Sequence, residues 1–258
     1  DWSDFQILAE LIEAHGIEPV PDKAFFENAD ITTTVASRSK RPIKLKVPLV
    51  IPGLGSTDVA KRNWDGLAKG SALSGIIETV GENVCGMDRD SIYSDGKVVR
   101  SPDLEFRISS FRALWDGKFG DIAVQTNVED TRAGVDQYAL SKLEVNIIER
   151  KWGQGAKAIG GEVRISSLER AIELKSRGYL VLPDPEDPSV QEAFRSGGFK
   201  TFERHSRVGF PDHRSFVEDV EGLRESGASH VFLKTGAYRP EVVAFTMKAA
   251  SEAKIDML

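Results

Sequence analysis

The segment KWGQGAKAIGGE, from Lys151 to Glu162, concentrates residues that could bind a flat or anionic ligand. Its four glycines would let the backbone approach such a ligand closely, because glycine carries no side chain. Gln154 can both donate and accept hydrogen bonds, which suits the polar edge of a ring or an amide. Lys151 and Lys157 could pair with an anion. The alternative is a glycine-rich turn with solvent-exposed lysines.

Four other polar or glycine-rich segments each follow a short apolar run directly. They are GLGS at 53–56, GENVCG at 81–86, QTN at 125–127 and KTG at 234–236. A lysine at the end of a buried strand, such as Lys234, is costly unless an anion pairs with it or its ammonium reaches solvent. The GLGS segment is not a dinucleotide-binding fingerprint, because the sixth position is Asp58 rather than glycine.

Histidine and cysteine give weaker signals. The four histidines, at positions 15, 205, 213 and 230, contain no pair with metal-helix spacing. The single cysteine, Cys85, excludes an internal disulfide and cannot by itself hold an iron–sulfur cluster or a cysteine zinc site. We therefore expect no metal site in this chain, a buried rather than catalytic thiol, and a reducing, cytoplasmic setting.

The pattern after Val47 alternates short apolar runs with helical periodicity, which predicts an α/β fold. Strands are expected at 47–51, 75–80, 121–126, 143–148, 179–182, 229–233 and, truncated, 255–258. Helices are expected over 102–115, 167–177 and 214–226 and from Pro240, with Ser101 as an N-cap and Gly178 and Gly227 as stops. A doubly wound sheet and a (β/α)8 barrel both fit, and the barrel needs a further strand after Leu258.

Residues 1–44 differ from the rest and form a predicted extension. An amphipathic helix is expected over 4–15, followed by an irregular polar stretch whose basic cluster (Arg38, Lys40, Arg41 and Lys44) we interpret as a solvated loop. Residues 45–258 then form the barrel.

Charge and hydropathy exclude two classes of function. Lys and Arg number 34 against 40 Asp and Glu, and this formal charge of −6 argues against a nonspecific nucleic-acid binder. No apolar run approaches the roughly 20 residues of a membrane span, and the N-terminus, DWSD, has no signal-peptide character.

The run WGQGAKAIGGE at 152–162 resembles the signature of the FMN-binding synthase domain of the glutamate synthases. PGLGS at 52–56, GEN at 81–83, DGKFGD at 116–121 and FLKTG at 232–236 are similar to further segments of that family, in the same order. Ala158 stands where the family has proline, and Asn83 replaces a glycine. ERKWGQGAKAIGGE, LPDPED, FERHSR and LKTGAYR are most similar to the synthase subunits of the N-methylglutamate synthases and related three-subunit systems.

The resemblance implies an FMN-linked (β/α)8 barrel at 45–258, with its C-terminal part outside this chain, which would then be a piece of a longer polypeptide. It implies cofactor-binding roles for Gly53, Gly55, Ser56, Glu82, Gln125, Lys151, Gln154 and Lys234. Lys157 and Lys234 would be catalytic, and Gln154, Lys157 and, more weakly, Arg177 would hold the substrate. An iron–sulfur cluster would need residues from elsewhere.

The implied chemistry is hydride transfer between FMN and the α-carbon of an amino or imino acid. In one version, methylamine and L-glutamate give N-methyl-L-glutamate and ammonia. In the other, ammonia, free or derived from glutamine, converts 2-oxoglutarate to glutamate. Implied partners are an amidotransferase-like subunit and a GXGXG-repeat subunit in a homo- or hetero-oligomer. The rival readings are another FMN- or phosphate-binding barrel, and a barrel that only scaffolds a complex.

Overall fold

The computed structural model describes residues 30–152, 163–205, 212–236 and 239–258. Thr32–Leu258 form one compact unit. The helix expected over 4–15 lies outside the described residues.

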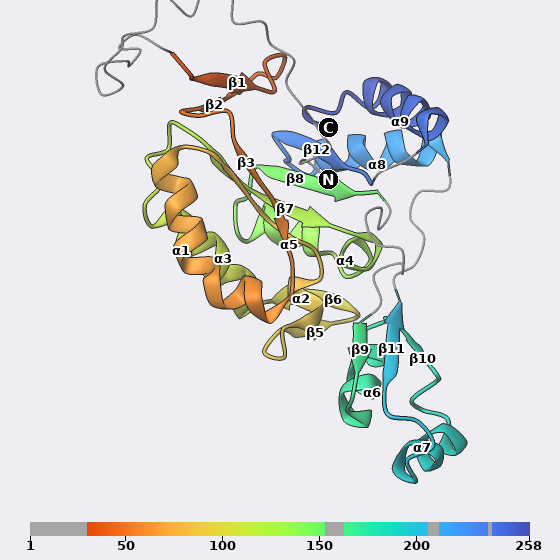
Figure 1. The fold of residues 1–258 in the computed structure, drawn as a ribbon. Helices are drawn as coiled ribbons and strands as arrows, with labels where there is room; N and C mark the ends of the chain where they lie inside the picture. Colours follow the sequence, from red (N-terminus) through yellow and green to blue (C-terminus); the bar gives the residue numbers. More distant parts are fainter. Residues whose placement is uncertain (1–29, 153–162, 206–211, 237–238) are drawn as a thin grey trace, which may run out of the picture. The chain divides into compact units, whose positions relative to one another are not determined.

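Five parallel strands form the central sheet, in the spatial order β12-β8-β7-β4-β3 (Figure 1). They are β3 (Val50–Leu54), β4 (Ile77–Val80), β7 (Asp121–Thr126), β8 (Ile147–Lys151) and β12 (His230–Lys234). Spatial order follows chain order, so this sheet has no reversal point of the doubly wound kind. Met257 continues the series through a parallel bridge to Phe232. The α/β prediction is confirmed, and the curled sheet corresponds to part of a (β/α) barrel.

Helices alternate with these strands. They are α1 (Asp58–Ser74), α2 (Val84–Met87), α3 (Pro102–Arg112), α4 (Val128–Arg132), α5 (Val135–Ser141), α8 (His213–Glu225) and α9 (Pro240–Glu252). A two-stranded hairpin, β5 (Ile92–Ser94) and β6 (Lys97–Arg100), precedes α3. Ser101 caps α3 as predicted, since its hydroxyl accepts the backbone N–H of Leu104. Local capping chemistry therefore fixes where this helix begins.

The two faces of the sheet bury separate apolar clusters. Side chains of the outer face pack beneath the helices; they are Val80, Ile122, Val124, Ile148, Val231 and Leu233. The inner face carries Ile77, Ala123, Ile147 and Phe232, which pack with Ile43 and Leu45. Because side chains alternate between faces along a strand, β4, β7, β8 and β12 each contribute to both clusters.

Ile43 and Leu45 belong to a hairpin that the sequence reasoning missed. Strand β1 (Thr33–Val35) pairs antiparallel with β2 (Ile43–Leu45), so the expectation of irregular chain up to residue 44 is wrong here. The cause is burial, because two alternate residues of this short segment face the inner apolar cluster. The basic residues of the cluster, Arg38, Lys40, Arg41 and Lys44, are exposed as predicted.

An inserted unit separates β8 from α8. It contains β9 (Val163–Ile165), α6 (Leu168–Ser176), β10 (Leu180–Leu182), α7 (Pro188–Arg195) and β11 (Phe202–His205), with an antiparallel sheet in the order β10-β11-β9. The strand expected at 179–182 exists, but its assignment to the barrel is wrong. Leu180 and Leu182 are exposed while Val181 is buried, the alternation of a strand covered on one face only.

The inserted unit docks on the backbone around α2. Arg177 donates to the carbonyl oxygens of Gly86 and Asp88, both at 2.8 Å, and Arg170 donates to that of Met87 at 2.8 Å. A Cβ added at Gly86 would lie only 1.5 Å from the hydroxyl oxygen of Tyr179. This contact requires glycine at position 86.

Replacing Gly86 with alanine should therefore destabilise the protein, because the added methyl group must displace Tyr179. We expect the free energy of unfolding to fall by about 1–3 kcal/mol, the usual cost of overpacking. Gly70→Ala in α1 is the matched control, since nothing lies within 4 Å of an added Cβ there. That change should raise stability by up to about 1 kcal/mol. Denaturant titration measures both; a Gly86→Ala protein as stable as wild type would show that Tyr179 moves aside freely.

A buried carboxyl group lies on the outer face of β4. Glu78 is fully buried and accepts a hydrogen bond from the Ser71 hydroxyl at 2.5 Å. Burial raises the pKa of Glu78 from 4.5 to about 7, since desolvation disfavours the charged form more than the Ser71 bond favours it. The group consequently holds a proton in much of the acidic range.

This raised pKa predicts a pH-dependent stability. The folded state binds the Glu78 proton more tightly than the unfolded chain, so the stabilisation is complete below about pH 4.5 and is lost as pH rises through about 7. Glu78→Gln imitates the neutral carboxyl and should be more stable than wild type by about 1–3 kcal/mol near pH 8, with little difference near pH 4.5. Denaturant midpoints at both pH values test this, with exposed Glu241→Gln as control. Equal midpoints for Glu78→Gln and wild type near pH 8 would contradict it.

Candidate functional site

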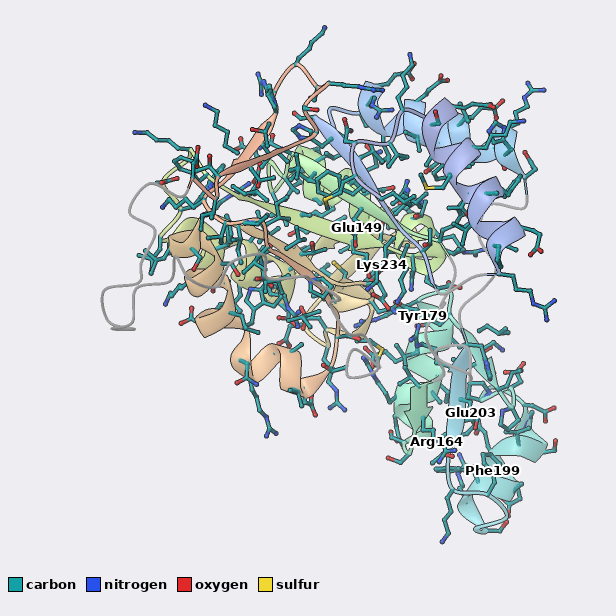
Figure 2. The ribbon with its side chains drawn as sticks, turned by 45° about the horizontal axis from the view of Figure 1, so that its top comes forward. Glu149, Arg164, Tyr179, Phe199, Glu203 and Lys234 are labelled. Carbon is teal, nitrogen blue, oxygen red and sulfur yellow. The ribbon has the colours of Figure 1, made fainter. Side chains whose placement is uncertain are left out.

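The inner face of the sheet changes from apolar to polar toward the carboxyl ends of the strands. Along β8, Ile147 lies in the inner apolar cluster, and Glu149 and Lys151 follow on the same face. The strand register places Gln125 of β7 level with Glu149, and Lys151 level with Lys234 of β12. Figure 2 labels Glu149 and Lys234, which come from these neighbouring strands. We call Gln125, Glu149, Lys151, Lys234 and Glu82 the rim cluster.

Gln125 and Glu149 form a buried hydrogen-bonded pair. The amide Nε2 of Gln125 donates to Oε1 of Glu149, and the two residues are 1% and 8% exposed. The amide oxygen of Gln125 has no hydrogen-bond partner among the described residues. A buried acceptor without a partner is costly, so this atom is suited to meet an N–H of a bound ligand.

The surroundings of Glu149 raise its pKa above the ordinary value. Burial raises the pKa of Glu149, whereas the hydrogen bond from Gln125 and the positive charge of Lys234 act in the opposite direction. A carboxyl group with a raised pKa can take and return a proton more readily at neutral pH than an ordinary one. Sequence reasoning missed Glu149 because the predicted strand ended at residue 148. The two-residue alternation from Ile147 would have placed it on the inner face.

Lys151 and Glu82 form an ion pair across the rim. Lys151 ends β8 and Glu82 belongs to the loop after β4, and their side chains are only 15% and 16% exposed. The prediction that both lie at the carboxyl ends of the strands is confirmed in position. Because the pair is neutral as a whole, Lys151 does not present an uncompensated charge to an anion.

Gly53 near the end of β3 and Gly55 just after it make room for the rim cluster itself. A Cβ at Gly53 would lie 2.7 Å from Nε2 of Gln125, and one at Gly55 would lie 2.7 Å from the carbonyl oxygen of Glu82. Ser56 follows in the same loop and is half-buried. These close approaches are internal packing, and contact of this loop with a cofactor stays a prediction.

The remaining predicted residues are not part of the described rim. Gln154 and Lys157 lie outside the described residues. Arg177 is bound to carbonyl oxygens near α2 and forms an ion pair with Glu173 at 2.7 Å, so the structure does not bring its guanidinium to the rim cluster. Cys85 is buried in α2, where burial raises the pKa of its thiol. The burial agrees with the expectation of a buried thiol.

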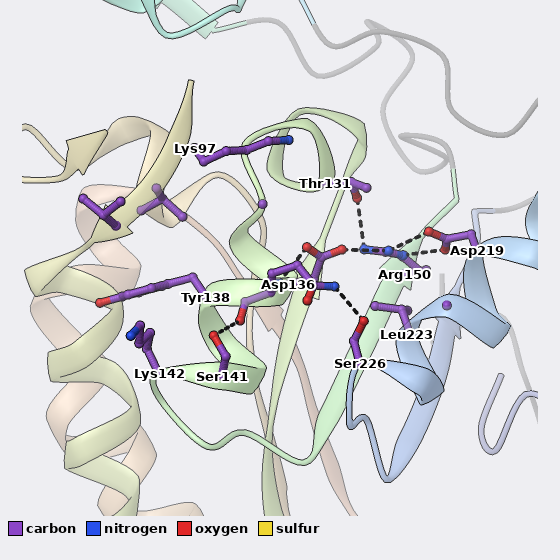
Figure 3. Close-up of a pocket in the computed structure, with 15 residues that line it drawn as sticks. Lys97, Thr131, Asp136, Tyr138, Ser141, Lys142, Arg150, Asp219, Leu223 and Ser226 are labelled. Carbon is purple, nitrogen blue, oxygen red and sulfur yellow. Dashed lines mark hydrogen bonds and ion pairs between the residues drawn. The ribbon is translucent and has the colours of Figure 1, made fainter. Parts of the chain in front are cut away.

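A depression of about 610 Å³ lies on the other face of β8, between α5 and α8 (Figure 3). Arg150 is one of the residues that line it; this side chain is 3% exposed and pairs with Asp219 at 2.7 Å and Asp136 at 2.8 Å. The same guanidinium also donates to Thr126 and Thr131. This network binds β8 to the outer helices, and it points away from the rim cluster because adjacent residues face opposite sides of a strand.

No protein-family profile matches the chain, and a search of curated proteins finds no match. No helix within the described ranges is long and apolar enough to cross a membrane. In the same ranges, no group of three or more His, Cys, Asp or Glu side chains could hold a metal ion.

Removing the charge of Lys234 should raise the pKa of Glu149 further, since the ammonium stabilises the carboxylate. The measurement is a titration of the Glu149 carboxyl by carbon NMR in Lys234→Met and wild type. Lys248→Met, which removes an exposed lysine of α9, should leave the titration unchanged. An unchanged or lower pKa in Lys234→Met would show that Lys234 does not act on Glu149.

Proposed function

We propose that this chain is the FMN-binding subunit of a glutamate-synthase-like enzyme that exchanges amino-acid nitrogen. The observation that carries the proposal is the convergence of Gln125, Glu149 and Lys234 at the carboxyl ends of three neighbouring parallel strands. In (β/α) barrels, active sites are built at this end of the strands. The order of the sequence motifs, which resembles that of the FMN-binding synthase domains, is the reason for proposing FMN as the cofactor. A complete (β/α)8 barrel is part of the same proposal.

The rim cluster has the groups that a flavin ring needs. The amide oxygen of Gln125, which has no partner among the described residues, would accept a ring N–H, and the Lys234 ammonium would offset negative charge on the ring. Thr79, on the inner face of β4, adds a buried hydroxyl without a partner among the described residues. When bound, FMN supplies the acceptor and donor of hydride.

Glu149 would handle the proton that accompanies the hydride. Oxidation of an amino acid to its imine removes a hydride from the α-carbon and a proton from the nitrogen. The carboxylate of Glu149 would accept that proton and return it when the imine is reduced again, which its raised pKa favours. Lys157 would hold a substrate carboxylate, and the Gln125 amide would keep Glu149 in place.

The proposed nitrogen donor is methylamine. L-glutamate would be oxidised to its imine, methylamine would replace ammonia on the imine carbon, and the returned hydride would give N-methyl-L-glutamate. No external reductant is needed, because the same two electrons leave and return. The similarity of the segments around 149–162 and 233–239 to N-methylglutamate synthases supports this choice over ammonia with 2-oxoglutarate. The amidotransferase-like and GXGXG-repeat subunits remain proposed partners.

An absorbance spectrum of the purified full-length complex tests this function. We expect a flavin band that bleaches when L-glutamate is added without oxygen and recovers with methylamine, with N-methylglutamate as product. Recovery only with 2-oxoglutarate and ammonia would favour the glutamate synthase reaction instead. Lys157→Ala should retain FMN and lose bleaching at moderate glutamate concentration, while exposed Lys142→Ala should behave as wild type. A complex that binds no flavin after reconstitution would contradict the enzyme assignment and favour a scaffold.

A further inference from the structure

Asn83 joins three parts of the molecule at the rim. It has a positive φ of 63° and follows Glu82 directly in the loop after β4. Its backbone N–H donates to Asp130 at 2.9 Å, and its side-chain oxygen accepts from Asn127 at 3.2 Å. The same oxygen accepts from Nη1 of Arg204 at 3.2 Å. Asn83 therefore links the loop after β4 to helix α4 and to the inserted unit.

Arg204 places a charged guanidinium in a buried position, which costs free energy. It lies on β11, is 2% exposed, and its guanidinium stacks 4.9 Å from the centre of the Tyr179 ring. Its Nε has no hydrogen-bond partner among the described residues. A buried cation that is only partly satisfied costs free energy, and an apolar side chain of similar size would often be more stabilising. Stability alone therefore does not account for an arginine here.

The neighbouring Glu82 is fixed on both sides by backbone contacts. On one side, the N–H of Gly81 donates to the carbonyl oxygen of Leu54 at 2.9 Å. On the other, Asn83 is held in its left-handed conformation by the bonds described above. Asparagine adopts this conformation more readily than other non-glycine residues, and at Asn83 the three hydrogen bonds fix the backbone and which way the side chain points. Within the described ranges, the hydrogen bond from Arg204 joins Asn83 to the inserted unit.

We propose that Arg204 is a positioning residue that transmits the docking of the inserted unit to the Glu82–Lys151 ion pair. By holding Asn83, Arg204 orients Glu82, and Glu82 fixes the ammonium of Lys151 at the rim. Displacement of the inserted unit would release Lys151 and make its charge available to an anionic ligand. The role of Arg204 rests on the proposed function, because it matters for activity only if the rim cluster is the active site.

Lysine reactivity tests this coupling without activity or flavin. The full-length complex is acetylated with a limiting amine-reactive reagent, and the rate at Lys151 is measured by mass spectrometry relative to exposed Lys248. In Arg204→Met we expect Lys151 to react severalfold faster than in wild type, and Arg204→Lys should restore part of the protection. Arg164→Met is the matched control, because Arg164 is an exposed arginine of the same sheet.

Asn83→Gly provides an independent variant if Arg204→Met fails to fold. Glycine keeps the left-handed backbone without strain but removes the side-chain acceptor, so Lys151 should again react faster. Unchanged Lys151 reactivity in folded Arg204→Met or Asn83→Gly would overturn the proposal, and so would equal acceleration at Lys248. Flavin content is measured separately. If the wild-type complex contains no flavin but Lys151 still reacts faster in Arg204→Met, the proposed function is refuted and the coupling stands.

Discussion

The close approach of two backbone segments, after β3 and after β4, is the constraint on which the rim depends. The N–H of Gly81 donates to the carbonyl oxygen of Leu54, and a Cβ at Gly81 would lie 2.3 Å from the nitrogen of Gly55. Arg107, fully buried, donates to the carbonyl oxygens of Leu54 and Gly55 and closes the contact from the outer side. With these strands in contact, Gln125 can lie over Gly53 and the carbonyl of Glu82 over Gly55.

Two adjacent residues of β8, Glu149 and Arg150, face opposite sides of the sheet and have different electrostatic surroundings. Arg150 faces outward and is neutralised by aspartates from α5 and α8, which fixes the helices to the strand. Glu149 faces inward, where burial raises its pKa although Gln125 donates to it and Lys234 is positively charged. A fully paired arginine on the outer side is typical of a structural network, whereas a buried carboxyl with a raised pKa is typical of a site able to exchange protons.

The fold could be predicted from sequence where local patterns decide it, as at β7 and α3, whose apolar periodicity and Ser101 cap are self-contained. The place of β10 could not, because a short apolar segment does not reveal its partner strands. The place of polar residues directly after apolar runs predicted Gln125, Lys151 and Lys234 at the rim but missed Glu149. The family resemblance suggested Arg177, as a weaker candidate, for the substrate, and the competing carbonyls near α2 could not be foreseen because they come from a distant part of the chain.

The hairpin of β1 and β2 has a consequence for the order of folding. Successive strand–helix units of the sheet are neighbours in the chain and can be added one at a time. The hairpin instead packs against Phe232, and the carbonyl oxygen of Arg41 accepts from His230 at 2.6 Å, across a separation of 189 residues. Such long closures are slow because they cost chain entropy before any contact is gained. The hairpin precedes every strand of the central sheet in the chain and is nevertheless among the last segments to be buried. Protection of its amides from hydrogen exchange would therefore report when β12 has joined the sheet.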